Sequence, residues 1–152
     1  MFIEELVYQQ ILKVMPISCI DLVVEDEYEN ILMLKRKNEP AKNMWWFPGG
    51  RIFYGETREL AVKRKLLEEC GLVGEIMNEI GTYDVFLNYN TKANENCLSH
   101  GISTFYKIKC VNTNTIVIDS QSSSFKWKPR TEWIKEINNP VLIKVLTKSL
   151  IK

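Results

Sequence analysis

The sequence contains a single histidine, His100, and its four cysteines form no close pair. Structural zinc sites use closely spaced cysteines and histidines, so the sequence has no pattern of that kind. Cys19, Cys70 and Cys110 lie in apolar or helical surroundings, and Cys97 lies in a polar segment. We therefore interpret them as reduced and mostly buried thiols, in preference to catalytic nucleophiles.

An excess of charge of one sign and a long apolar run are also missing. Lys plus Arg total 20 and Asp plus Glu total 19, so the formal net charge of +1 gives no global field to attract nucleic acid. The longest apolar stretch, around residues 17–24, is interrupted by Asp21 and is too short to span a bilayer. The N-terminus lacks the basic flank and cleavage site of a signal peptide. We expect a cytoplasmic protein that binds neither nucleic acid nor membrane.

The sequence does contain enough apolar side chain for one ordinary globular domain. The chain has 152 residues, of which 45% are hydrophobic and 26% are charged. A chain of this length buries a core without support from a metal or a disulfide. Residues 1–152 are therefore predicted to form a single domain.

Helices and strands are predicted to be interspersed along the chain. Apolar residues at helical spacing, with Thr131 as one N-cap and Pro140 at one helix start, predict helices at residues 4–14, 57–70, 131–137 and 140–152. β-rich runs predict strands at residues 17–25, 30–36, 44–50, 73–89, 101–111, 115–119 and 125–129. Polar loops are expected at residues 90–100 and 120–124. This order favours α/β or α+β packing around a mixed sheet.

The predicted helix at residues 57–70 presents carboxylates on one face. At about 100° per residue, Lys65, Glu68 and Glu69 lie close together around the helix, and Val62 with Leu66 occupies the neighbouring arc. Clustered carboxylates repel one another unless a cation neutralises them, and Mg²⁺ or Mn²⁺ suits such hard oxygen ligands. The simpler alternative is a solvated ion pair between Lys65 and one of the glutamates.

A glycine pair and a further carboxylate lie just before this helix. Gly49 and Gly50 allow the close approach of a metal ion or a phosphate to the backbone. Glu56 is placed where the helix dipole favours an anion. The whole segment is therefore suited to binding a metal ion together with a phosphate group.

The spacing of these residues resembles the Nudix box, whose pattern is G-x5-E-x7-R-E-U-x-E-E-x-G-U with U aliphatic. Residues 50–72 match the pattern at Gly50, Glu56, Arg64, Leu66, Glu68, Glu69, Gly71 and Leu72. Lys65 is the one departure, because the family normally has Glu there. The resemblance implies the α+β Nudix fold, a mixed sheet between helices, over essentially the whole chain.

The resemblance also implies roles for the box residues. Glu68 and Glu69 would be ligands of Mg²⁺, with Mn²⁺ as an alternative, and the Gly50 region would offer a backbone carbonyl. Arg64 would orient glutamates by a charge-assisted hydrogen bond, and Glu56 together with Arg64 would support the box. Lys65 takes the place of a third acid, and its positive charge would weaken a cluster of several metal ions.

A second segment, LKRKNEPAKNMWWFPGGR at residues 34–51, is similar to the GDP-mannose mannosyl hydrolases. This Nudix branch has itself lost the first Glu of the box, and it cleaves the bond between sugar C1 and oxygen with inversion, releasing GDP. The residues to which the resemblance gives a function are Asp21, Arg36, Arg51, Glu69 and Gln121. The two arginines would hold the diphosphate, and Gln121 would join Glu69 around one Mg²⁺.

The resemblance leaves the general base open. The branch places a histidine directly after the glutamine, whereas this sequence has Ser122, a poor proton acceptor at neutral pH. His100, Asp21 and Glu95 are the alternatives.

Three functions follow for this domain. The first is a magnesium-dependent hydrolase of nucleoside diphosphate sugars that releases the sugar and the nucleoside diphosphate. The second is a pyrophosphohydrolase that cleaves the diphosphate of a nucleoside triphosphate, ADP-ribose or a nucleotide sugar. The third is a module that binds a nucleotide sugar without catalysis. Because the resembling branch packs its N-terminal helix across a dimer, we expect a homodimer.

Overall fold

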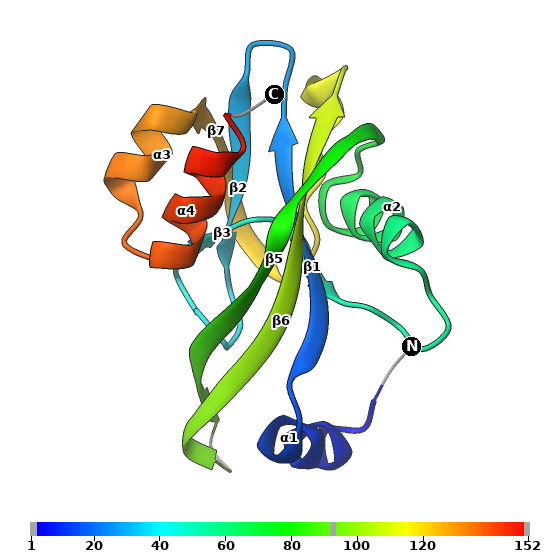
Figure 1. Ribbon diagram of the computed structural model, residues 1–152, viewed down its shortest axis with the longest axis vertical. Helices are drawn as coiled ribbons and strands as arrows, with labels where there is room; N and C mark the ends of the chain where they lie inside the picture. The colour runs from blue at the N-terminus through cyan, green and yellow to red at the C-terminus, as the bar shows by residue number, and fades with distance from the viewer. Residues whose placement is uncertain (1–2, 92–93, 151–152) are drawn as a thin grey trace.

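The computed structural model describes the backbone of residues 3–91 and 94–150, together with the side chains of these residues outside 89–97 (Figure 1). Its elements are, in chain order, α1 (Glu5–Val14), β1 (Ile17–Glu25), β2 (Asn30–Arg36), β3 (Trp45–Trp46), β4 (Gly49–Arg51), α2 (Arg58–Cys70), β5 (Gly74–Thr91), β6 (Asn94–Cys110), the 3-10 turn η1 (Thr113–Thr115), β7 (Ser122–Pro129), α3 (Arg130–Glu136) and α4 (Pro140–Lys148).

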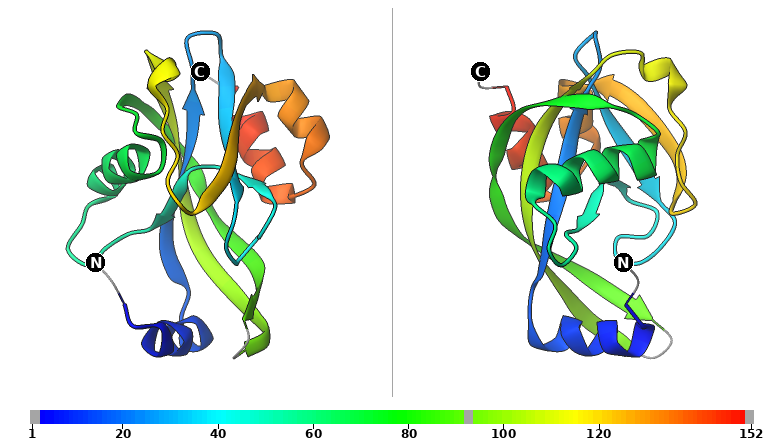
Figure 2. Two further views of the ribbon diagram at one scale, coloured as in Figure 1. Left: turned by 180° about the vertical axis from the view of Figure 1, so that it is seen from behind. Right: turned by 90° about the vertical axis from the view of Figure 1, so that its right-hand side faces the viewer.

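The strands form one seven-stranded mixed sheet. Its main path runs β3-β2-β1-β6-β5, while β4 pairs with β1 and β7 pairs with β2. β1 and β6 run parallel, and the other pairs are antiparallel. Helix α2 covers one face of the sheet, and α3 with α4 covers the other (Figures 1 and 2). The predicted α+β fold, a mixed sheet between helices, is confirmed.

Alternation along β1 divides its side chains between two cores. Ile20 and Leu22 belong to the cluster that α2 completes with Val62 and Leu66. Val23 belongs to the cluster on the other face, which α3 and α4 complete. Because successive side chains of a strand point to opposite faces, Asp21 shares its face with Val23 and lies in an apolar layer.

Helix α2 forms within one residue of the prediction. The Thr57 hydroxyl accepts a hydrogen bond from the Leu60 N–H at 3.3 Å and caps the first turn. The helix ends at Cys70 and is followed by Gly71 in the left-handed conformation. Local capping chemistry therefore sets both ends of the helix that carries the box.

The strand predicted at residues 115–119 is wrong. This segment continues from η1 as irregular structure and lies along the end of α2. The Val117 N–H donates to the Cys70 carbonyl at 2.9 Å, and the Asp119 N–H donates to the Glu69 carbonyl at 3.4 Å. The free carbonyls at the helix C-terminus thus take the hydrogen bonds that a neighbouring strand would have accepted.

The two predicted polar loops are strands for much of their length. Residues 122–124 belong to β7, where Ser122 pairs with Arg36 of β2. Residues 94–100 belong to β6, which pairs with β5 in a long hairpin. Polar composition predicted loops here because local sequence does not reveal which segment will serve as pairing partner.

Helix α3 starts one residue before its predicted N-cap. The helix begins at Arg130, so Thr131 lies inside its first turn and is not the cap. Arg130 is buried, and its guanidinium donates to Glu25 Oε2 at 3.0 Å and to Ser149 Oγ at 3.1 Å. This buried ion pair connects α3 to the end of β1.

The cysteines within the described side chains are free thiols, as expected. Cys70 and Cys110 are buried and Cys19 is half-buried. Burial raises the pKa of Cys19 to about 12 and that of Cys110 to about 11, and it raises the pKa of Cys70 further. Such thiols are poor nucleophiles at neutral pH. The side chain of Cys97 lies outside the described residues.

The helices of residues 3–91 and 94–150 are all too short or too polar to cross a membrane.

Helix α1 lies at one end of the molecule, beside the far end of the β5–β6 hairpin (Figure 1). Leu12 is its buried residue, whereas Leu6 and Val14 are 66% and 79% exposed. The predicted apolar side of this helix is therefore mostly uncovered in the single chain.

The packing of α4 against the sheet predicts a strong dependence on Leu146, whose side chain is fully buried. Replacing Leu146 by Ala removes buried methyl groups and leaves a cavity, so we expect the free energy of unfolding to fall by about 2–5 kcal/mol. Leu150→Ala is the matched control, because Leu150 is 57% exposed and its truncation should cost under about 0.5 kcal/mol. Urea titration measures both values, and equal losses would contradict the assignment of α4 as a core helix.

Candidate active site

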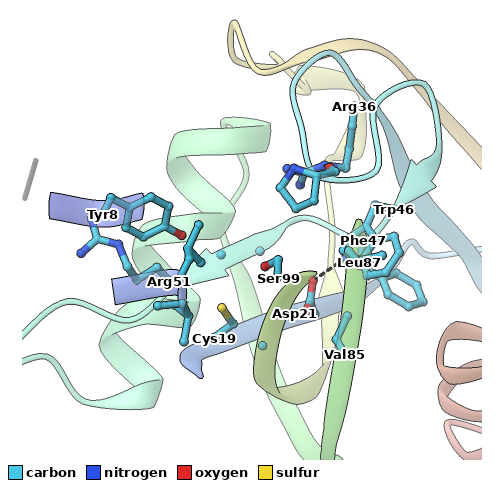
Figure 3. A pocket seen from close by; sticks show the side chains of 16 residues that line it. Tyr8, Cys19, Asp21, Arg36, Trp46, Phe47, Arg51, Val85, Leu87 and Ser99 are labelled. Carbon is cyan, nitrogen blue, oxygen red and sulfur yellow. Dashed lines mark hydrogen bonds between the residues drawn. The ribbon is translucent and has the colours of Figure 1, made fainter. Parts of the chain in front are cut away.

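A pocket of about 160 Å³ opens between α1, the β5–β6 hairpin and the segment that leads to α2 (Figure 3). Its walls come from parts of the chain far apart in sequence. The residues that line it are Tyr8, Leu12, Ile17, Cys19, Asp21, Arg36, Pro40, Trp46, Phe47, Gly49, Gly50, Arg51, Val85, Leu87, Ser99 and Gly101.

The pocket brings together Asp21, Arg36 and Arg51, which the sequence marked as substrate-binding residues. Arg36 is held by a hydrogen bond of 2.7 Å from its Nε to the Pro40 carbonyl. The guanidinium of Arg51 lies 6.0 Å from the ring centre of Tyr8. Two guanidinium groups at one pocket form an electrostatic environment suited to a diphosphate.

Asp21 is a buried carboxylate in the pocket wall. Its Oδ1 accepts a hydrogen bond from Trp46 Nε1 at 3.0 Å, and its Oδ2 accepts a short one from the Ser103 hydroxyl. Burial raises the pKa of Asp21 to about 7, although both hydrogen bonds favour the charged form. A carboxyl group with this pKa can accept a proton near neutral pH.

Arg64 organises the segment that leads to α2. Its Nε and Nη2 form a bidentate pair with the Glu56 carboxylate at 2.6 and 2.8 Å, and Nη2 also donates to the Arg51 carbonyl at 3.1 Å. The Phe53 ring lies under the guanidinium at 3.7 Å. The hydrogen bonds from Arg64 lower the pKa of Glu56 to about 2. Arg64 thus holds the Glu56 carboxylate and the backbone at Arg51.

Glu69 lies between α2 and the glycine pair. It is 7% exposed, and its Oε2 accepts the Gly49 N–H at 3.1 Å while its Oε1 accepts from Lys65 Nζ at 2.9 Å. Burial raises the pKa of the Glu69 carboxyl, although Lys65 acts against this. The side chain of Glu68 is 49% exposed and lies 3.1 Å from Arg64 Nη1. The ion pair considered from the sequence is present, and the Lys65 side chain lies beside Glu69 with only a small part of its surface exposed.

Gly49 is required by close contacts with the backbone of β1, and Gly50 is favoured by its positive φ. A Cβ at Gly49 would lie 2.3 Å from the Ile20 carbonyl oxygen and 2.8 Å from Asp21 Oδ1. Gly50 has a φ of 149°, and a Cβ there would lie 2.9 Å from Lys65 Cε. The glycine pair therefore permits β4 to pass close to β1 on one side and to Lys65 on the other.

The donor atoms at the box are oxygens of the kind that a hard divalent cation prefers as ligands. Glu68 and Glu69 supply carboxylate oxygens, and the backbone near Gly50 supplies carbonyls. Within the part of the chain that the structure describes, no three acidic, histidine or cysteine side chains are already arranged around a metal position. The Lys65 ammonium takes the position of a cation at Glu69. The residues therefore fit one metal ion, provided that Lys65 Nζ moves away from Glu69.

His100 and Gln121 are not brought to the pocket. Ser99 and Gly101 line it, so alternation along β6 turns His100 to the other face, where its Nε2 lies 2.8 Å from Asp84 Oδ1 and its ring stacks on Phe86. Gln121 is exposed, with its carbonyl accepting the Lys37 N–H at 2.8 Å.

Two further residues considered from the sequence are Ser122 and Glu95. Ser122 is buried beside Arg36 in the sheet. The side chain of Glu95 lies outside the described residues.

Sequence reasoning missed three residues at this site. Asp119, two positions before Gln121, is close enough to raise the pKa of Glu69. Its position in the same polar segment was the available signal. Ser103 meets Asp21 through the parallel pairing of β1 with β6, and Tyr8 reaches Arg51 from α1. Both contacts depend on tertiary arrangement, so no local pattern indicated them.

Comparison with known proteins identifies the family of this chain. The NUDIX domain profile matches residues 15–146. The low-salt glycan biosynthesis protein Agl8 of Haloferax volcanii is 32% identical over 120 residues, which are 78% of this chain and 74% of that protein. An ADP-ribose pyrophosphatase of Methanocaldococcus jannaschii is 40% identical over 68 residues, 45% of this chain and 40% of that protein.

The fold is also that of known structures. The NUDIX domain of Shewanella oneidensis NrtR, in complex with ADP ribose, superimposes with a TM-score of 0.69 at 18% identity, over 97% of each chain. This likeness concerns the fold. The profile match over residues 15–146 shows that the chain belongs to the Nudix domain family, the family of the Nudix hydrolases.

Proposed function

We propose that this Nudix domain is a magnesium-dependent hydrolase of nucleoside diphosphate sugars, for which GDP-mannose is the first substrate to test. The proposed reaction is attack of water at the anomeric carbon, with release of the sugar and the nucleoside diphosphate. The observation that supports it most directly is the pocket itself. Arg36, Arg51 and Asp21 line it together with the glycine pair, and Gly49 contacts the box residue Glu69.

The two arginines are proposed to bind the diphosphate. Its negative charge increases as the bond to the sugar breaks, so cations at this place stabilise the transition state more than the substrate. The pocket, at about 160 Å³, is smaller than the ~300–1,000 Å³ that encloses a whole ligand, so it would hold one part of a nucleotide sugar. Apolar residues such as Leu12 and Val85 complete the wall.

The proposed ligands of Mg²⁺ are Glu68, Glu69 and a backbone carbonyl at Gly50, with Gln121 or the neighbouring Asp119 reaching in from the segment before β7. A bound divalent ion withdraws electrons from a phosphate oxygen and so improves the diphosphate as a leaving group. Arg64 contributes indirectly, because it fixes Glu56 and the Arg51 backbone.

Asp21 is the favoured general base. It lies in the pocket wall with a pKa raised by burial to about 7, whereas His100 is paired with Asp84 on the other face of the hairpin. These observations support Asp21 over His100 as the proposed base.

A pyrophosphohydrolase is the second candidate function. The ADP-ribose pyrophosphatase relative matches this chain over a 68-residue segment. The same arginines would bind the diphosphate, and attack would occur at phosphorus. A third candidate, binding without catalysis, is favoured by one observation only, the ion pair of Lys65 with the proposed ligand Glu69.

Product analysis with GDP-mannose and Mg²⁺ separates these functions. We expect free mannose and GDP; mannose phosphate and GMP would show the pyrophosphohydrolase instead, and recovery of intact GDP-mannose would support binding alone.

Glu69→Gln should abolish the magnesium-dependent turnover and leave the fold intact, because it removes the charge of a proposed ligand. Glu59→Gln, on the exposed first turn of the same helix, is the control and should retain full activity.

The base assignment predicts a specific pH dependence. A base works when it is ionised, so turnover should rise with pH through about 7, the pKa of Asp21 in the folded protein. Asp21→Asn should lower turnover by about 10²–10⁴-fold and remove this rise. His100→Asn should leave both the rate and its pH profile close to wild type. A pH–rate profile of the three proteins tests this, and a loss confined to the His100 variant would reverse the assignment.

The expected homodimer also remains a proposal. The exposed apolar residues of α1, Leu6, Val7 and Val14, form a surface that a second chain could cover. Light scattering in solution should give the mass of two chains, and a monomer would remove this part of the proposal.

A further inference from the structure

Lys65 is held in an unusual place for a lysine. Its side chain is 13% exposed, and its Nζ lies 2.9 Å from Glu69 Oε1 and 3.8 Å from Glu68 Oε2. A Cβ at Gly50 would lie 2.9 Å from Lys65 Cε and 3.2 Å from its Nζ, so the side chain passes directly over the glycine backbone. Lysines are seldom buried unless they are paired. Three separate contacts, with Glu69, with Glu68 and with the Gly50 backbone, therefore define the position of the Lys65 side chain.

The remaining groups around Glu69 make Lys65 its main source of positive charge. Arg64 is engaged by Glu56 in a bidentate pair. The Gly49 N–H supplies a neutral hydrogen bond to Glu69 Oε2, and nearby Asp119 adds negative charge. Because a buried carboxylate is costly without a counter-charge, the Lys65 ammonium stabilises Glu69 in the metal-free protein.

We propose that Lys65 is a tethered cation that competes with the divalent ion for Glu69 and thereby sets the metal affinity of the box. The inference rests on the proposed metal dependence and specifies which residue tunes it. A divalent ion coordinated by Glu69 Oε1 and an ammonium at 2.9 Å from the same oxygen repel each other strongly. Metal binding therefore requires the ammonium to leave Glu69, and this displacement lowers the affinity.

Binding of Mn²⁺ to the full chain without nucleotide, followed by electron paramagnetic resonance, tests the inference. Lys65→Met removes the competing charge and keeps the length of the side chain, so we expect Mn²⁺ to bind at least about tenfold more tightly than to wild type. Lys65→Arg retains the charge and should bind like wild type.

Lys63→Met is the matched control, because Lys63 carries the same charge on the same helix but is exposed. It should leave the affinity unchanged. Equal or weaker Mn²⁺ binding by Lys65→Met, or the same gain in Lys63→Met, would overturn the inference.

Thermal unfolding gives a second readout that does not depend on activity. Without metal, Lys65→Met should unfold at a lower temperature than wild type, because Glu69 is left buried without its partner. Saturating Mn²⁺ should raise the midpoint of this variant more than that of wild type. A midpoint that Mn²⁺ raises no more in the variant than in wild type would contradict the proposal. Should Lys65→Met not fold, Lys65→Gln replaces it in both experiments.

These experiments separate this inference from the proposed function. A protein that binds Mn²⁺ with the expected order of affinities but hydrolyses no nucleotide sugar would retain the role of Lys65 and remove the proposed reaction. A protein that hydrolyses the substrate but binds Mn²⁺ equally in all variants would do the reverse.

Discussion

The buried carboxylate of Glu69 is the constraint on which the site depends. One of its oxygens accepts the Gly49 N–H and the other accepts the Lys65 ammonium, so it connects the end of α2 to β4. β4 in turn pairs with β1 next to Asp21. A charge with so little exposure is stable only when both its oxygens are bonded. Glu69 therefore connects the helix to the sheet at the site.

Arg64 provides the second fixed point of the same arrangement. Its guanidinium contacts the Glu56 carboxylate, the Arg51 carbonyl and the Phe53 ring, so it organises the turn between β4 and α2. The backbone of Arg51 is thereby held while its side chain extends to the pocket. Arg64 acts through other residues, whereas Arg51 can touch a substrate directly.

The pocket shows how one carboxylate acquires properties that its sequence position does not reveal. Asp21 sits in an otherwise apolar strand and receives hydrogen bonds from Trp46 and Ser103. These bonds offset part of the desolvation cost, and the balance leaves the pKa at about 7. A stronger set of donors would hold Asp21 ionised, and an entirely apolar pocket would keep it protonated. The intermediate balance is what makes proton transfer near neutral pH possible.

The box could be predicted from the sequence because its interactions are local. Helix α2 was predicted from one short segment, and the structure adds the Thr57 cap and the pairing of Arg64 with Glu56 as local contacts of the same segment. The mixed sheet followed from the order of the predicted helices and strands, and its place between helices followed from the resemblance to the Nudix family. The arrangement of the residues outside the box could not be predicted in this way.

Ser103 and Asp21 are 82 positions apart and meet only through the parallel pairing of β1 and β6. His100 and Ser99 are neighbours in sequence, yet the alternation of β6 puts them on opposite faces. Residues 115–119 read as a strand but bond to the end of α2. Strand partners, register and the choice of hydrogen-bond acceptor are properties of the packed chain, because they depend on contacts between segments that local sequence does not describe.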